Sequence, residues 1–300
     1  MLPPVPMSAA LQPERSMTSP PLIHVAHSPD PDDAFMFWAL ATGRIDTGRR
    51  RYVHELADIE SLNRRALAGE LEVTAVSLHA YAYLADRYAL LAHGASVGDR
   101  YGPRLVARDG PPADARGALA GRLVAVPGEL TTAFLTLKLY QREVRHVVVP
   151  FDQIEEFVVA GGADVGLLIH EGQLPYADRG LRLWADLGEW WHTETGLPLP
   201  LGGNVERRDF GERLTREIAR DVKASIEFAL AHRGEALAHA KGYGRGLDDA
   251  RTDRFVGMYV NEFTLDYGPA GRRAVAELLA RAHRAGLVPA MGEVTFVAAA

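Results

Sequence analysis

A strand–turn–helix pattern occurs twice in this chain and constrains its fold more than any other feature. Residues 25–35 read VAHSPDPDDAF, residues 124–134 read VAVPGELTTAF, and the two segments align without a gap. Each begins as an apolar strand, passes through a turn with proline or glycine, and enters a helix. Residues 69–76 and 161–168 are a second matching pair, in which a helix stops at glycine and a strand begins. Each half is therefore predicted to run strand, helix, strand, helix, strand.

This repeat predicts an α/β fold with two lobes and a central cleft. Short apolar runs alternate with segments of helical period, as expected of α/β architecture. Ligands of open α/β sheets bind beyond the carboxyl ends of the strands, so two such ends facing each other would enclose a binding site. The alternative is that any two strand–helix–strand segments look alike at this level, and then the repeat says nothing about lobes.

The later part of the chain indicates a return to the first lobe. The Pro/Gly-rich segment at 197–203 is typical of the end of a lobe, and residues 212–232 and 270–285 have the apolar spacing of helices that pack on one. We expect two hinge strands near residues 104–108 and 204–208. The expected parts are a disordered N-terminal extension at 1–20, a discontinuous first lobe at 21–106 and 206–300, and a second lobe at 107–205.

Composition excludes several classes of function. The 300 residues are 47% hydrophobic and 24% charged, as in an ordinary globular protein, and the net charge of -6 gives no field that would gather nucleic acid. The absence of cysteine excludes disulfides and thiolate chemistry. No apolar segment approaches the roughly 20 residues of a membrane span, and residues 1–20 lack a signal-peptide pattern. We therefore expect a cytoplasmic protein that binds neither nucleic acid nor membrane.

Sequence motifs for nucleotides and metals are missing. There is no G-x-G-x-x-G after a strand, no phosphate loop ending in Gly-Lys, and no G-x-S-x-G elbow. The segment that begins His170-Glu171 lacks the second histidine of a zinc-binding helix, and no other cluster has metal-ligand spacing. We therefore expect a small-molecule substrate in the cleft and no metal or nucleotide cofactor.

The start of the first repeated helix concentrates three aspartates, Asp30, Asp32 and Asp33. Asp30 before Pro31 fits an N-cap, and Asp33 then falls where an acid can reach back to the cap amide. All three carboxylates also favour the positive end of the helix dipole. This structural interpretation needs no ligand, and the functional alternative is that Asp32 or Asp33 faces a ligand.

Four more side chains are candidates for the cleft. Thr131 and Thr132 stand at the second helix start, where amides and hydroxyls suit a carboxylate, although Thr131 could simply cap the helix. Ser77 ends a predicted strand and either binds ligand or caps the next helix. His170 ends the apolar run at 165–169, and its ordinary pKa of about 6.5 suits proton abstraction. A lone histidine after an apolar run is nevertheless more often structural.

Several motifs, in order along the chain, resemble those of one family. They are SPDPDDAF at 28–35, IESLN at 59–63, TTA at 131–133, IHE at 169–171, TGLPLPLG at 195–202 and YVNEFTLD at 259–266. Together they are similar to the 1,4-dihydroxy-6-naphthoate synthases of the futalosine route to menaquinone. The resemblance covers nearly everything from residue 22 onward, and although no single motif is decisive, their order is hard to obtain by chance.

This resemblance implies a type II periplasmic-binding-protein-like fold, with two α/β lobes joined by two hinge strands. It also implies a cytoplasmic, cofactor-independent carbon–carbon lyase that converts cyclic de-hypoxanthine futalosine to 1,4-dihydroxy-6-naphthoate and expels the sugar-derived fragment. His170 matches the histidine taken as the base that removes the proton starting this elimination. Ser77, Thr131 and Thr132 match positions that contact ligand in the cleft.

The chain departs from the family at the first helix start, where relatives read SPCPNDTF. Asp30 replaces cysteine and Asp32 replaces asparagine, so one cleft wall gains two charges that repel a substrate carboxylate. We therefore expect the carboxylate against Thr131 and Thr132. Asp30 and Asp32 are expected to bind substrate on the other wall, where Asp32 accepts hydrogen bonds from sugar hydroxyls. The same departure admits a second function, a solute-binding protein of this fold that holds a small polar or cationic ligand without catalysis.

Overall fold

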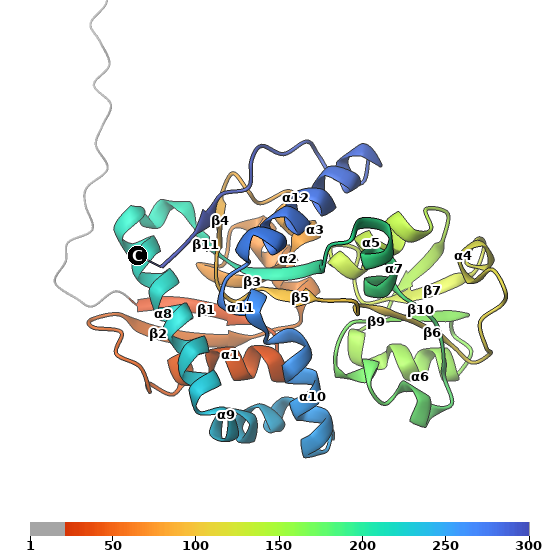
Figure 1. The fold of residues 1–300 in the computed structure, drawn as a ribbon, viewed down its shortest axis with the longest axis horizontal. Helices are drawn as coiled ribbons and strands as arrows, with labels where there is room; N and C mark the ends of the chain where they lie inside the picture. The colour runs from red at the N-terminus through yellow and green to blue at the C-terminus, as the bar shows by residue number, and fades with distance from the viewer. Residues whose placement is uncertain (1–21, 300) are drawn as a thin grey trace, which may run out of the picture.

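The computed structural model describes residues 22–299, which form two β-sheets covered by helices (Figure 1). The first sheet contains β1 (Leu22–His27), β2 (Arg51–Leu56), β3 (Val73–Ser77), β4 (Tyr88–Leu91), β5 (Ser96–Gly98), β11 (Leu199–Arg207) and β12 (Phe296–Val297). The second contains β6 (Arg104–Ala107), β7 (Leu123–Val126), β8 (Arg145–Val148), β9 (Val165–Leu168) and β10 (Arg182–Asp186). Their strand orders are β12-β4-β11-β3-β1-β2, with β5 beside β11, and β10-β6-β9-β7-β8.

The repeat predicted from the sequence reappears as matching strand orders. In the first sheet β1 pairs in parallel with both β2 and β3. In the second sheet β7 pairs in parallel with both β8 and β9. The first strand of each half thus lies between the next two, an order that is common in doubly wound α/β sheets. The predicted two-sheet α/β fold is therefore confirmed.

Helices cover both faces of each sheet. They are α1 (Pro31–Ala41), α2 (Ile59–Ala68), α3 (Leu78–Tyr81), α4 (Ala115–Ala118), α5 (Thr132–Tyr140), α6 (Ile154–Val159), α7 (Leu187–Thr195), α8 (Glu212–Ala231), α9 (Arg233–Ala240), α10 (Asp249–Tyr259), α11 (Glu262–Leu265) and α12 (Gly268–Arg284). One face of the first sheet packs against α1, α8 and α9, and the other against α2, α3 and α12. One face of the second sheet packs against α5 and α7, and the other face packs against α6. Burial on both faces explains why β3 and β9 are buried at every residue.

The connections between the sheets differ from the expected hinges. Residues 104–108 and 204–208 lie largely inside strands, because β6 pairs with β9 and β10 while β11 pairs with β3, β4 and β5. The chain changes sheet at 99–103 and at 187–198 instead. The Pro/Gly-rich segment at 197–203 does contain the point where the chain enters the first sheet, and from Leu199 it is a strand with a register shift between Pro200 and Gly202.

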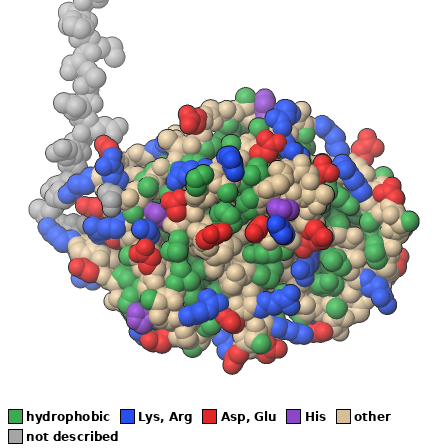
Figure 2. Space-filling model, in the orientation of Figure 1, with side chains coloured by type: hydrophobic (Ala, Val, Ile, Leu, Met, Phe, Trp, Pro, Cys, Tyr) green, Lys and Arg blue, Asp and Glu red, His purple; other side chains and the backbone are tan. Residues whose placement is uncertain are grey.

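The lobe boundaries remain a proposal, and sheet membership favours 22–98 with 199–299 for the first lobe and 104–186 for the second. The predicted extension at 1–20 lies outside the described residues. Within 22–299, no helix is long and apolar enough to cross a membrane. Figure 2 shows acidic and basic side chains interspersed over one face of the molecule, without a large patch of one sign.

Candidate active site between the lobes

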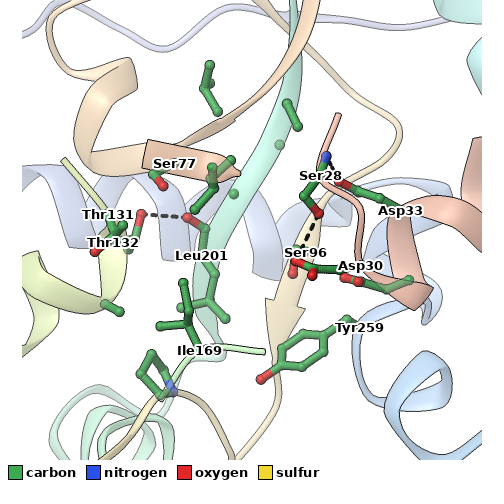
Figure 3. A pocket seen from close by; sticks show the side chains of 18 of the residues that line it. Ser28, Asp30, Asp33, Ser77, Ser96, Thr131, Thr132, Ile169, Leu201 and Tyr259 are labelled. Atoms are coloured by element: carbon green, nitrogen blue, oxygen red, sulfur yellow. Dashed lines mark hydrogen bonds between the residues drawn. The ribbon is translucent and has the colours of Figure 1, made fainter. Parts of the chain in front are cut away.

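A cavity lies between the two sheets, where strands end and helices begin (Figure 3). Its empty volume is about 730 Å³, open solvent included. The polar side chains that line it are Ser28, Asp30, Asp32, Asp33, Ser77, Ser96 and Tyr259 from the first lobe and Thr131 and Thr132 from the second. Every predicted site residue except His170 therefore meets at one cavity.

The helix-start interpretation of Asp30 and Asp33 is only partly right. Asp30 occupies the N-cap position of α1 and Pro31 follows, as predicted, but the Asp30 side chain makes no cap hydrogen bond. It accepts hydrogen bonds from Ser28 Oγ and Arg245 Nη1, both at 2.9 Å. Asp33 reaches back, but to the amide of Ser28 at 2.8 Å rather than to the cap amide of Asp30, and burial raises its pKa to about 6. The Asp30 carboxylate therefore binds Ser28 and Arg245 of its own lobe rather than the amides of the helix.

Asp32 is the acid of this cluster with the fewest partners. It lines the cavity, and burial followed by the charges of Asp33 and Asp30 holds its pKa well above the ordinary value. The amides of Asp32 and Asp33 oppose this effect, and no other side chain among residues 22–299 hydrogen-bonds to the Asp32 carboxyl. Its oxygens are consequently available to a ligand.

The opposite wall is the N-terminus of α5. Thr131 caps this helix, because its Oγ1 accepts from the Phe134 amide at 3.1 Å and donates to the Gly128 carbonyl at 2.8 Å. Thr132 Oγ1 donates to the Leu201 carbonyl (Figure 3). Both hydroxyls are therefore already used, and the capping alternative for Thr131 is confirmed. The free donors at this wall are the first helical amides, which have no intrahelical partner and can hold an anion.

Ser77 lies at the carboxyl end of β3 and faces the cavity. It precedes α3 but makes no side-chain cap hydrogen bond, so the capping alternative is wrong. Its position is set by fully buried Asn63, whose Oδ1 accepts from the Ser77 amide at 2.9 Å and whose Nδ2 donates to Ser77 Oγ at 3.1 Å. Because Ser77 Oγ accepts from Asn63, its own proton remains free for a ligand.

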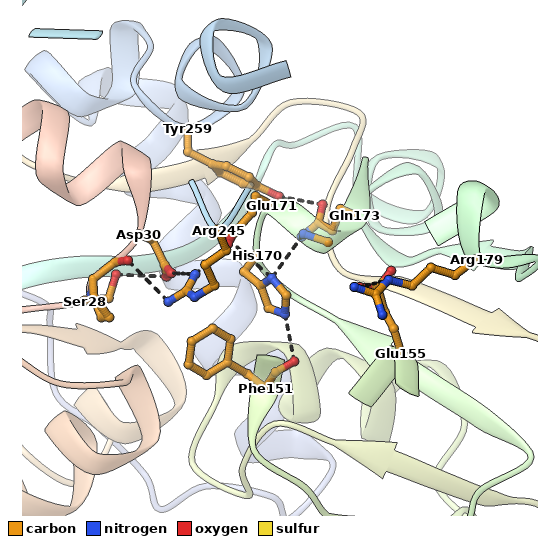
Figure 4. Close-up of polar contacts among 12 residues, drawn as sticks. Ser28, Asp30, Phe151, Glu155, His170, Glu171, Gln173, Arg179, Arg245 and Tyr259 are labelled. Atoms are coloured by element: carbon orange, nitrogen blue, oxygen red, sulfur yellow. Dashed lines mark hydrogen bonds and ion pairs between the residues drawn. The ribbon is translucent and has the colours of Figure 1, made fainter. Parts of the chain in front are cut away.

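His170 lies behind the cavity wall, which is formed at this point by Ile169. Both ring nitrogens have protein partners: Nε2 lies 2.7 Å from the Phe151 carbonyl, and Nδ1 accepts from the Gly172 amide at 3.1 Å (Figure 4). Burial would lower the pKa of His170, but the adjacent carboxylate of Glu171 and the charge of Asp30 raise it above its ordinary value. The sequence thus predicted the strand end correctly and missed the orientation of the ring.

Sequence reasoning also missed residues that join the lobes at this site. Arg245, from the loop before α10, contacts both Asp30 and Glu171 (Figure 4). Tyr259 donates from its hydroxyl to Gln173 Oε1 at 3.0 Å. No motif marks Arg245, whose only local signal is its place between two glycines in the sequence GRG.

Nothing in the described part of the chain resembles a metal centre. Within residues 22–299, no three side chains of His, Cys, Asp or Glu are arranged to hold a metal ion. Asp30, Asp32 and Asp33 lie close together, but Arg245 and helix amides already neutralise them in part. The expected independence from metal and nucleotide cofactors stays a prediction.

Comparison with known proteins decides the family. A family model described as menaquinone biosynthesis matches residues 23–284. The chain belongs to this family. A 1,4-dihydroxy-6-naphthoate synthase of Thermus thermophilus is 43% identical over 265 residues, covering 88% of this chain and 95% of the relative. The synthase of Streptomyces coelicolor is 40% identical over 276 residues, covering 90% and 96%. The resemblance inferred from the motifs, and with it a role in menaquinone biosynthesis, is confirmed.

Solved structures agree with the fold. The crystal structure of an Archaeoglobus fulgidus protein is 46% identical, with a TM-score of 0.85 over 89% of this chain and 98% of that one. An alkanesulfonate-binding protein of Xanthomonas axonopodis has a TM-score of 0.66 over 92% and 97% but is only 13% identical. The second likeness shows the fold alone, so the periplasmic-binding-protein-like architecture is confirmed and a solute-binding function is not favoured.

Proposed function

We propose that this protein is a 1,4-dihydroxy-6-naphthoate synthase, a carbon–carbon lyase that acts on cyclic de-hypoxanthine futalosine with His170 as general base. The observation that carries the proposal is the chemical asymmetry of the cavity in a chain 40–43% identical to two such synthases. One wall is a helix N-terminus and the other holds three carboxyl groups. A substrate with a carboxylate at one end and sugar-derived hydroxyls at the other matches these walls.

The substrate carboxylate binds against the first amides of α5. The Thr131 and Thr132 hydroxyls shape this wall without being free to donate to the ligand, whereas Ser77 retains a proton to donate. Asp32 accepts hydrogen bonds from the sugar-derived hydroxyls on the other wall. The reversed orientation would place the carboxylate beside Asp30, Asp32 and Asp33, whose ionised forms repel it. The two walls therefore fix the direction of binding.

His170 removes the proton that starts the elimination after its ring leaves the arrangement seen here. A base must place a free nitrogen within hydrogen-bond reach of the proton it abstracts, and both nitrogens now have protein partners. Its neighbour Ile169 lines the cavity, so a local rearrangement at the end of β9 brings the ring to the substrate. We further infer that the enzyme acts in the cytoplasm, as the family resemblance implies.

Turnover by the purified full chain tests the proposal. The protein is incubated with cyclic de-hypoxanthine futalosine, and 1,4-dihydroxy-6-naphthoate is sought by mass spectrometry, with protein omitted as the control. We expect product to accumulate in proportion to the amount of protein. Calorimetry in parallel measures binding of the same compound. Binding without any product would reject the synthase and favour the solute-binding alternative.

A further inference from the structure

The side chain of Arg245 joins the two lobes beside the cavity (Figure 4). Its Nη1 atom lies 2.9 Å from Asp30 Oδ1 and 2.6 Å from Glu171 Oε1. Its Nη2 atom donates to the Pro29 carbonyl at 3.3 Å. Pro29 and Asp30 immediately precede α1 of the first lobe, whereas Glu171 follows β9 of the second. One guanidinium group therefore bridges the two strand ends that face each other across the cleft.

Arg245 also touches two residues beside the His170 ring, Glu171 and Phe151. Arg245 binds Glu171 through Oε1. The other oxygen of this carboxylate, Glu171 Oε2, lies 3.4 Å from His170 Nδ1. Phe151, whose carbonyl lies 2.7 Å from His170 Nε2, presents its ring to the Arg245 guanidinium at 4.7 Å. Glu171 Oε2 is buried and has no hydrogen-bond partner within the described residues. Glu171 Oε2 thus lies beside Nδ1, the ring nitrogen that gains a proton when His170 becomes charged.

The backbone of Arg245 is independent support for a specific role. Its φ of 42° lies in the left-handed region, which is unfavourable for a residue with a side chain. Such a conformation persists only where surrounding contacts enforce it. The contacts that enforce it here are those to Asp30, Glu171 and Phe151.

We propose that Arg245 is a positioning residue for His170, tying the orientation and proton affinity of the base to the contact between the lobes. This inference rests on the proposed function, because it assigns a partner to the same base. The charged groups that face His170 are the carboxylates of Glu171, Asp30 and Glu155. Arg245 forms ion pairs with Glu171 and Asp30. Arg179 forms an ion pair with Glu155. Without Arg245, two carboxylates beside the ring lose their counter-charge.

The pH dependence of kcat/KM tests the proposal, because its acidic limb reports the pKa of an essential base in the free enzyme. Arg245→Gln leaves Glu171 and Asp30 uncompensated, which favours protonated His170 and moves this limb to higher pH. Activity at pH 7 falls by about 10–100-fold through misplacement of the base. Arg245→Lys restores the charge and part of the activity, whereas Glu171→Gln moves the limb to lower pH.

Arg251→Ala is the matched control, because it removes another ion pair between the lobes, Arg251 with Asp178 at 2.7 Å, away from His170. The limb should not move in this variant. Loss of activity in Arg245→Gln with an unmoved limb would mean that Arg245 acts only through stability, and would overturn the proposal.

A titration that needs no turnover separates failure of this inference from failure of the proposed function. The His170 ring signal is followed by NMR in the full chain and assigned by its loss in His170→Gln. A raised titration midpoint of the His170 ring in Arg245→Gln supports the positioning role of Arg245. This holds even if His170→Gln keeps its activity, a result that would reject only the assignment of His170 as the base. An unchanged midpoint overturns the role of Arg245 whatever the activity.

Discussion

Glu60 and Gly128 meet across the two lobes without room for another atom. The Glu60 carboxylate accepts a hydrogen bond from the Leu130 amide at 3.0 Å, and a Cβ added at Gly128 would lie 2.3 Å from Glu60 Oε2. Glu60 belongs to α2 of the first lobe, and Gly128 to the turn that leads into α5. Because Gly128 has no side chain, Glu60 of the first lobe can bind the turn that leads into the N-terminus of α5, the anion-binding wall.

Gly128→Ala is expected to weaken substrate binding. The added methyl group displaces Glu60 or the turn, which misplaces the first amides of α5, and we expect KM to rise by about tenfold with a smaller change in kcat. Steady-state kinetics measure both constants. Gly234→Ala is the control, because no atom lies within 4 Å of its added Cβ and the position is inside helix α9. Equal KM values for Gly128→Ala and the wild type would show that the contact has no role in binding.

Asp32→Asn tests the polar wall of the cavity. The amide keeps the size of the side chain but presents only one acceptor oxygen and no charge, so hydrogen bonds from sugar-derived hydroxyls weaken. We expect KM to rise by about tenfold, the equivalent of one charged hydrogen bond. Asp86→Asn, on an exposed residue outside this cavity, controls for the change in net charge. If Asp32→Asn leaves the steady-state constants unchanged, Asp32 is only a helix-end residue.

Tyr259→Phe removes a hydrogen bond that links the two lobes across the cleft. The Tyr259 hydroxyl donates to Gln173 Oε1 across the lobes, and both side chains are buried. We expect kcat/KM to fall by a factor that corresponds to about 1 kcal/mol. In a double-mutant cycle with Gln173→Leu, the double variant should have a kcat/KM only slightly below that of either single variant. Tyr88→Phe loses a hydrogen bond to Leu71 inside the first lobe, so it should lower stability without changing KM.

Glu206→Gln is expected to change the pH dependence of stability. Glu206 on β11 is fully buried, and burial raises its pKa to about 8 from 4.5. A carboxyl group whose pKa is raised in the folded state favours folding below its unfolded pKa, and this contribution is lost as the pH rises through the folded value. Relative to the wild type, Glu206→Gln should therefore gain thermal stability between pH 5 and pH 9. A constant difference in Tm over that range would contradict the assigned pKa.

The repeat predicted the fold because it is a local pattern. Strand, turn and helix signals at 25–35 and 124–134 needed no knowledge of distant residues, and they gave the equivalent places of β1 and β7 in their sheets. The path between the sheets was harder. Pro200 and Gly202 read as a loop, whereas pairing with β3 and β5 makes them part of a strand.

The site was predicted in part, for the same physical reason. Positions at strand ends and helix starts follow from the chain, so Ser77 and Asp32 were placed at the cavity. The direction of the His170 ring depends on Phe151 and Gly172, and the partner of Asp30 is Arg245, 215 residues away in the sequence. Such contacts exist only once each lobe has folded.

Single-turnover kinetics of His170→Gln test whether His170 is the general base. With enzyme in excess over cyclic de-hypoxanthine futalosine, we expect the variant to bind substrate with a Kd close to that of the wild type. Loss of the base should slow the formation of 1,4-dihydroxy-6-naphthoate by about 10²–10⁴-fold. Formation of product at the wild-type rate in His170→Gln would contradict the account.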